Sequence, residues 1–318
     1  MKLWILTLIS ALALPCTSFA WGKRGHAVVC EAASLLVSPE PKSEFMRGSS
    51  YDLAYYCNVP DLVWKKPKTY KVEWFNHFMD LEIFEREMKD TPREKPFELD
   101  RNAFNEAFPK IKNEAGRAWW RIRELDHRLE GLTQKLRGDG LKKDKRHELQ
   151  ADWLVTAGAI GHYVADLAQP LHVTENFDGQ LTSQKGIHSF FEDALVDELF
   201  GEAPSTLEAD IRKLAREKWA KATLKEKTLL ELLEGLSRAS GEALKPVLAA
   251  DQKTGRSDRK KALDAQRSVI LDRLSEGAVY LAEIWRRRLG WDFNGEKFYR
   301  FEGQPKFIEP PAPNQKKK

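Results

Sequence analysis

His162-Tyr-Val-Ala-Asp166-Leu-Ala-Gln-Pro-Leu-His172, followed by His188-Ser-Phe-Phe-Glu192, is the most informative stretch of the sequence. In both places a histidine precedes a carboxylate by four residues, so on a helix the two side chains project from one face. Pro170 is expected to end the first helix near Ala168 or Gln169, which places His172 outside that helix. Imidazole nitrogen and carboxylate oxygen are donors that zinc accepts, so the stretch predicts a metal site.

The distribution of histidines supports this prediction. The chain has 7 histidines, and three of them fall in this one stretch. A single His-x3-Asp pair is more often an ion pair on a helix surface, but two such pairs around a Pro-Leu-His turn favour metal ligands. His127 lies between two charged residues and His147 lies in a polar connection, so we assign neither to the site.

The first residues read as an export signal. Met1-Lys2 precedes an apolar run that ends at Pro15, and Thr17-Ser18-Phe19-Ala20 follows. This pattern predicts a signal peptide over residues 1–20 with cleavage after Ala20, and hence a secreted or periplasmic protein. The run is short for a membrane span, which favours release over a retained anchor.

Helical periodicity dominates the rest of the chain. Apolar residues recur at helical steps in 25–38, 101–136, 151–168, 188–200, 206–221, 225–248 and 262–290. No stretch shows sustained strand alternation, so we expect an all-α protein with one domain over 21–300 and a polar connection at 137–149. The proline- and lysine-rich residues 301–318 are expected to form a disordered basic tail.

Charge and cysteine content leave alternatives open. The 52 basic and 48 acidic residues give a net charge of +4, which argues neither for nor against a polyanionic partner. Cys30 and Cys57 remain after cleavage; they could form a disulfide in an oxidising compartment, or be two unrelated buried thiols.

Three further motifs contain possible metal donors. After cleavage the mature chain would begin with Trp21-Gly-Lys-Arg-Gly-His26. The free α-amine of Trp21, with a pKa near ~8, could then bind metal. Asp61 follows a proline, and His77-Phe-Met-Asp80 adds another histidine and carboxylate. Taken singly, each is more simply a buried tryptophan with a nearby histidine, a helix cap or a core histidine.

Together these motifs resemble the superfamily of zinc-dependent phospholipases C and single-strand-specific nucleases, which includes fungal secreted and plant bifunctional nucleases. The order is Trp-Gly-x-x-Gly-His, an isolated Asp, His-Phe-x-Asp, His-x3-Asp-x2-Gln-Pro-Leu-His and a final His-x3-Asp/Glu, and it runs from residue 21 to 192. The remaining third of the chain matches only as helical scaffold.

The resemblance implies a helical phosphoesterase domain with a cleft that holds three zinc ions. The implied ligands are Asp61, His77, His162 and Asp166 for one ion; His172, His188 and Glu192 for a second; and the Trp21 amine and carbonyl, His26 and a bridging Asp166 for a third. Asp61, Asp80 and Asp166 are the implied catalytic carboxylates, with Asp80 supporting water or a histidine ligand. Phe78 is the implied base-stacking ring, and Trp64 is a second candidate for stacking. For the Trp119-Trp120 pair we favour core packing.

The sequence departs from the nuclease pattern in three places. A basic residue commonly follows the Asp ligand by three positions, and here that position is Trp64, followed by two lysines. The interval from Thr174 to His188 lacks the Gly-Gly-Asn loop of the nucleases, and Glu192 is the residue type that the phospholipases use.

The expected activity is hydrolysis of phosphodiesters in single-stranded RNA or DNA, and of 3′-nucleotides, by a metal-activated water. A phospholipase C acting on lipid head groups is the main alternative, and a non-catalytic zinc-binding protein is a weaker one. We expect a monomer without a stable protein partner.

Overall fold

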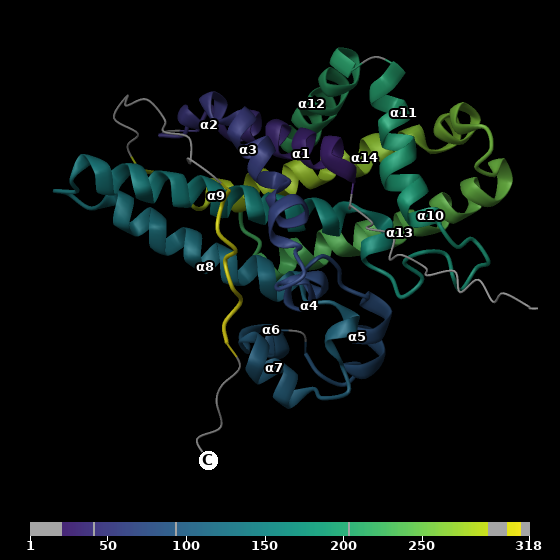
Figure 1. Cartoon of the computed structure of the whole chain (residues 1–318), viewed down its shortest axis with the longest axis horizontal. Coiled ribbons are helices and arrows are strands. Elements are labelled where there is room, and N and C mark those ends of the chain that lie inside the picture. Colours follow the sequence, from purple (N-terminus) through teal and green to yellow (C-terminus); the bar gives the residue numbers. More distant parts are fainter. Residues whose placement is uncertain (1–20, 41, 93, 203, 292–303, 313–318) are drawn as a thin grey trace, which may run out of the picture.

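The computed structural model describes residues 21–40, 42–92, 94–202, 204–291 and 304–312 (Figure 1). The predicted signal peptide lies outside these ranges. The α-helices of the described chain are α1 (Gly22–Val37), α2 (Phe45–Gly48), α3 (Ser50–Cys57), α4 (Tyr70–Glu73), α5 (Leu81–Glu87), α6 (Glu94–Glu98), α7 (Arg101–Ala107), α8 (Ala118–Arg137), α9 (Lys143–Ala168), α10 (Ile187–Ser189), α11 (Leu195–Glu202), α12 (Pro204–Lys221), α13 (Leu229–Thr254) and α14 (Arg259–Arg286). Short 3₁₀ or π turns are η1 (Pro60–Trp64), η2 (Trp74–Asn76), η3 (Asn113–Ala115), η4 (Pro170–His172) and η5 (Phe190–Ala194).

Helix α9 forms the centre of the protein. Its residues from Trp153 to Ala168 are all buried, because α1, α3, α8, α13 and α14 pack around it (Figure 1). The side chains of a helix that is covered on every side must be small or apolar wherever a neighbouring helix comes close. A Cβ atom at Gly158 would lie 2.3 Å from Cβ of Tyr56 on α3, so α3 could not pack at this distance against any larger residue.

The all-α prediction is confirmed for the described residues, which contain no strand and only one isolated bridge, between Met79 and Gly116. Helix α9 ends at Ala168, as Pro170 predicts, and the turn η4 follows.

Two predicted boundaries are wrong. The expected helix over 101–136 is interrupted between α7 and α8, where Pro109 and the positive φ of Gly116 (89°) break the helical path. The expected polar connection at 137–149 is shorter than predicted, since α9 begins at Lys143. The first two turns of α9 are polar because much of their surface faces solvent.

The segment 304–312 does not fit the predicted disordered tail. It runs along the body past α8 towards α7 (yellow in Figure 1), and its two ends contact Trp64 of η1 and Asn102 of α7. Trp64 Nε1 donates to the carbonyl of Pro305 at 3.1 Å, and Asn102 Nδ2 donates to that of Ala312 at 2.9 Å. Phe307 packs against the core, so this part of the chain buries an apolar side chain and satisfies polar groups of the body.

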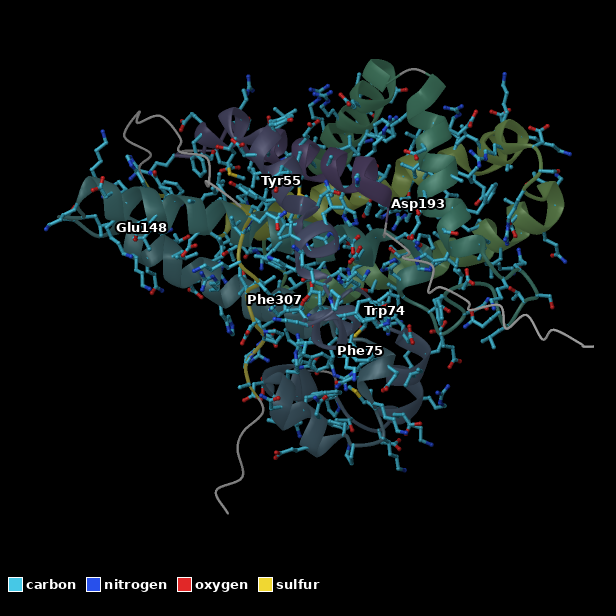
Figure 2. All side chains as sticks on the ribbon, viewed as in Figure 1. Tyr55, Trp74, Phe75, Glu148, Asp193 and Phe307 are labelled. Atoms are coloured by element: carbon cyan, nitrogen blue, oxygen red, sulfur yellow. A yellow bond between two sulfur atoms is a disulfide. The ribbon has the colours of Figure 1, made fainter. Side chains whose placement is uncertain are left out.

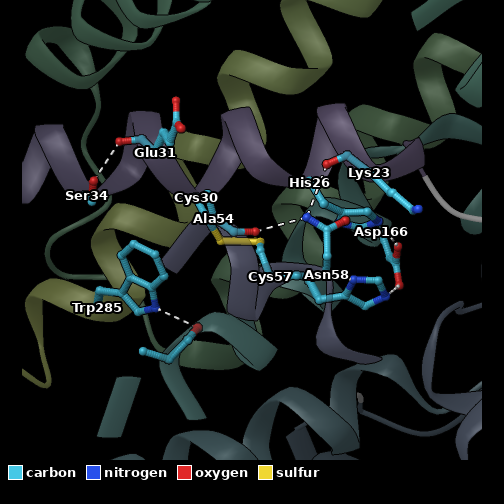
Figure 3. The surroundings of a disulfide bond; sticks show 12 residues. Lys23, His26, Cys30, Glu31, Ser34, Ala54, Cys57, Asn58, Asp166 and Trp285 are labelled. Carbon is cyan, nitrogen blue, oxygen red and sulfur yellow. Dashed lines mark hydrogen bonds and ion pairs between the residues drawn. A yellow bond between two sulfur atoms is a disulfide. The ribbon is translucent and has the colours of Figure 1, made fainter. Parts of the chain in front are cut away.

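A disulfide joins Cys30 of α1 to Cys57 at the end of α3 (Figure 3). Both cysteines are fully buried, and a Cβ at Gly161 of α9 would lie 2.3 Å from Cys30 Sγ. Asn58 adds a second link, because its Nδ2 donates to the Lys23 carbonyl of α1 at 3.2 Å. Helices α1, α3 and α9 are therefore fixed to one another beside the predicted metal ligands.

Candidate metal centre

Helices and turns that are far apart in the sequence bring the predicted donors together. In the described residues, three groups of side chains place one donor atom each within 4.8 Å of the others. The groups are His26, Asp61 and His162; His77, His162 and Asp166; and His172, His188 and Glu192. All of these side chains except that of His188 are at most 7% exposed, so each group could hold a metal ion away from bulk water.

Asp166 belongs to the second group and lies next to His26 of the first. Its Oδ1 is 3.4 Å from Nε2 of His26, while its Oδ2 is 3.0 Å from Nδ1 of His77. Nε2 of His162 is 3.0 Å from the same Nδ1 of His77. The two oxygens of one carboxylate thus face two different histidines, so Asp166 could offer a donor atom to either group.

The third group is the predicted set His172, His188 and Glu192. Nε2 of His188 lies 2.9 Å from Glu192 Oε2, and Nε2 of His172 lies 3.4 Å from the same oxygen. Gln169 Nε2 donates to this oxygen at 2.9 Å, which fixes the carboxylate from behind. The grouping otherwise differs from the implied one, because His26 is joined with Asp61 and His162.

Main-chain carbonyls orient three of the histidines. In each of them Nδ1 carries the hydrogen, because a carbonyl can only accept, and this leaves the Nε2 lone pair facing the cluster. The three contacts are His162 to the Cys57 carbonyl at 2.7 Å, His172 to the His77 carbonyl at 2.7 Å, and His188 to the Phe177 carbonyl at 2.8 Å. The rings are held in the tautomer that a metal ligand needs.

The polar atoms left without partners test whether metal ions fit. Both ring nitrogens of His26 and Oδ1 of Asp166 are buried and form no hydrogen bond. Leaving such atoms unpaired costs about 1–3 kcal/mol each, so a ligand is expected to satisfy them. Imidazole nitrogens and carboxylate oxygens are donors that zinc accepts.

The electrostatics of the cluster point to the same ligand. Burial, followed by the charge of Asp61, raises the pKa of Asp166 well above its usual range. Burial likewise lowers the pKa of His26 and His162 well below the usual value, so both imidazoles are neutral. Neutral imidazoles beside several crowded carboxylates form a site that a divalent cation would stabilise.

A cavity of about 430 Å³ opens beside the third group, and His77, His172 and His188 form part of its wall. The rest of its lining is rich in aromatic rings: Trp74, Phe75, Phe78 and Phe177. Figure 2 shows Trp74 and Phe75 above the lobe formed by α5 to α7. The cavity therefore joins the second and third candidate metal groups to flat apolar surfaces.

Two predicted residues lie in this cavity. Phe78 is half-buried and lines it, as a stacking ring would. Asp80 also lines it, with Oδ1 unpaired, and burial raises the pKa of its carboxyl to about 8. Asp80 is therefore protonated at neutral pH in the metal-free chain and poised to bind a polar group in the cavity.

Trp64, which we predicted as a second stacking residue, does not lie where it could stack on a molecule in this cavity. It is 1% exposed and does not line the cavity, because its indole is enclosed by Phe307 and the guanidinium of Arg121. A tryptophan with this packing is part of the core. Trp119 and Trp120 are buried as well, as predicted.

Trp21 is buried at the start of α1. Its Nε1 donates to the carbonyl of Ala165 at 2.8 Å, one residue before Asp166. Gly25 must be small here, since a Cβ would lie 2.6 Å from Cβ of Trp21. The main chain of Trp21 thus begins beside the cluster, and its role as a ligand stays a prediction.

Sequence reasoning missed two ionisable residues near the site, Lys65 and Glu73. Lys65 lines the cavity, and its Nζ lies 3.1 Å from Asp61 Oδ1. Glu73 is fully buried, with Oε1 3.4 Å from Nε2 of His77. The spacing of Glu73 and His77 is four residues, the same as in the two pairs that predicted the site, so this signal was present.

Neither a comparison with protein-family models nor one with curated protein sequences finds a match for this chain. The functional assignment therefore depends on the site itself.

Proposed function

We propose that the protein is an exported zinc-dependent phosphodiesterase that hydrolyses single-stranded nucleic acid, and 3′-nucleotides as smaller substrates. The observation that carries the proposal is a cluster of three metal-capable groups, two of which contribute histidines (His77, His172 and His188) to the wall of one cavity with aromatic sides. The order of the motifs, which resembles that of the phospholipase C and nuclease superfamily, supports the same chemistry.

The proposed ligands are those of the three groups, with the Trp21 amine completing the set after cleavage. Zinc ions bound there would neutralise the charge of a phosphodiester and lower the pKa of water to near ~7. The chain's own carboxylates balance the charge of the ions, and the carbonyl contacts keep the imidazoles aimed at them. Lys65, beside Asp61, gives the cavity a cation that attracts the phosphate.

The aromatic lining favours a nucleic acid. A phosphate placed against the metal groups would leave its base or sugar within reach of Phe78, Trp74 and Phe75. Every base has a flat face, so stacking supplies binding energy without demanding one sequence.

A phospholipase C is the second candidate. Phe177 is 49% exposed and Leu181 is 66% exposed on the loop that precedes α10. Exposed apolar side chains beside a cavity suit contact with a lipid surface, and Glu192 is the residue type of the phospholipases.

Export is part of the proposal. A buried disulfide is typical of proteins that fold in an oxidising compartment. Among the described residues, no helix combines the length and the apolar character that crossing a membrane requires.

A substrate panel tests the proposal. The chain that begins at Trp21 is loaded with zinc and offered single-stranded DNA, RNA, a 3′-nucleotide and phosphatidylcholine micelles. We expect cleavage of the nucleic acids. Lipid turnover without nucleic-acid cleavage would establish the second candidate, and bound zinc with no turnover would indicate a non-catalytic zinc-binding protein.

A further inference from the structure

Behind the metal centre, on the side away from Asp166, lies a buried polar network that the proposed reaction does not use. His77 directs Nδ1 to Asp166 and Nε2 to the opposite side, where Glu73 Oε1 lies 3.4 Å away. Nδ1 can bind a metal only if the hydrogen sits on Nε2, and that hydrogen needs an acceptor. Glu73 is the carboxylate at that position, and its side chain is fully buried.

Two donors hold the Glu73 carboxylate in place. The hydroxyl of Tyr163 donates to Oε1, and Asn76 Nδ2 donates to Oε2 at 2.9 Å. Tyr163 lies on α9 one residue after His162, so the same helix turn carries a metal ligand and the support of another ligand.

Arg121 of α8 continues the network away from the metal centre. Its Nε lies 3.5 Å from the Tyr163 hydroxyl, and its Nη2 donates to the carbonyl of Ile308 at 2.5 Å. The guanidinium is 1% exposed and lies 5.7 Å from the ring centroid of Phe307. The segment 304–312 thus closes the outer end of the network.

We propose that Glu73 is a positioning residue that fixes the orientation of His77 in the metal centre, and that Arg121 and Tyr163 fix Glu73 in turn. A buried carboxylate behind a histidine ligand sets the ring's tautomer and strengthens the ligand. This inference rests on the proposed zinc centre, but it concerns metal affinity and not the identity of the substrate.

The test compares Glu73→Gln with Glu283→Gln in the full chain. Both glutamates are buried, and Glu283 binds Arg286 and Arg287 on α14 instead of a metal ligand. Zinc affinity is measured by competition with a chromogenic chelator, and the visible spectrum of the cobalt-loaded chain reports the ligand geometry. We expect Glu73→Gln to lower zinc affinity about 10- to 100-fold and to shift the cobalt bands, with Glu283→Gln unchanged in both.

A second pair of variants covers the case in which Glu73→Gln does not fold. Tyr163→Phe removes one donor to Glu73. Arg121→Met removes the contacts to Tyr163 and Ile308 and leaves an unbranched side chain of similar reach in the core. We expect both to lower zinc affinity several-fold and Arg273→Met, at another buried arginine, to leave it unchanged.

The outcomes are separable. If the unaltered chain binds zinc and the Glu73 and Tyr163 variants bind it equally well with unchanged cobalt spectra, the positioning role is wrong and the proposed function stands. If the unaltered chain binds no zinc, both fail.

Discussion

The carbonyl of Cys57 accepts a hydrogen bond from Nδ1 of His162 at 2.7 Å. The residue that closes the disulfide with Cys30 therefore also orients a candidate metal ligand on α9. The disulfide lies against Gly161, the residue before His162. The disulfide and the candidate metal centre are neighbours, so we expect the geometry of one to depend on the other.

Loss of the disulfide should weaken both stability and metal binding. Replacing Cys30 and Cys57 by alanine is expected to lower the free energy of unfolding by about 2–4 kcal/mol, because the unfolded chain gains freedom. The Cys57 carbonyl remains but is held less firmly, so zinc affinity should fall as well. Urea unfolding and chelator competition measure the two effects. Equal zinc affinity with and without the disulfide would contradict the proposed coupling.

Removal of a shared ligand should abolish function. We expect His162→Ala or Asp166→Ala to reduce zinc content and to lower activity by at least about 100-fold, since even outer contacts of metal ligands contribute about 10- to 100-fold. Metal binding is coupled to folding, so the melting temperature should fall too. His127→Ala, at an exposed helix position, is the control. Full turnover in either ligand variant would refute the cluster.

Residues retained before Trp21 should cost one metal ion. The free α-amine can bind zinc, whereas an amide nitrogen has no usable lone pair. We compare zinc content per chain by elemental analysis in a protein that starts at Trp21 and one that keeps additional residues before it. The expected difference is one ion. The same zinc content in both proteins would exclude the terminus as a ligand.

The carboxyl of Asp80 should make the metal-free chain less stable as the pH rises. Its folded pKa is about 8 against 3.8 in the unfolded chain. Between these values the folded chain holds the proton that the unfolded chain has released, so stability falls with increasing pH, by at most about 1.4 kcal/mol per pH unit.

Asp80→Asn removes this dependence. Unfolding in the presence of chelator at pH 5 and pH 8 should show the variant gaining stability over the native chain, with a larger gain at pH 8. A gain of equal size at both pH values would show that Asp80 is already ionised in the folded protein.

Phe78 should contribute to binding of a base and not to metal binding. We expect Phe78→Ala to raise KM for a single-stranded oligonucleotide about 5-fold or more, as base stacking contributes about 1–3 kcal/mol. Zinc content should stay unchanged. Phe108→Ala, at a half-buried ring that stacks on Phe104, serves as the control. An unchanged KM would show that Phe78 does not contribute to substrate binding.

The sequence by itself determined what a single element can encode. The four-residue spacing of His162 and Asp166 predicted one face of a helix, Pro170 predicted its end, and the apolar periodicity predicted an all-α protein. These patterns are local, because helical geometry relates residues three or four positions apart wherever the helix lies.

The tertiary structure decided which distant residues meet. Trp64 has an aromatic ring of the kind that stacks on bases. Pro305 and Phe307, far along the chain, cover it and make it part of the core. Glu73 had the spacing of a ligand partner, yet only the packing of α8 and α9 behind it gives it Tyr163 and Arg121 as supports. Contacts of this kind depend on how whole helices pack, and no local spacing specifies them.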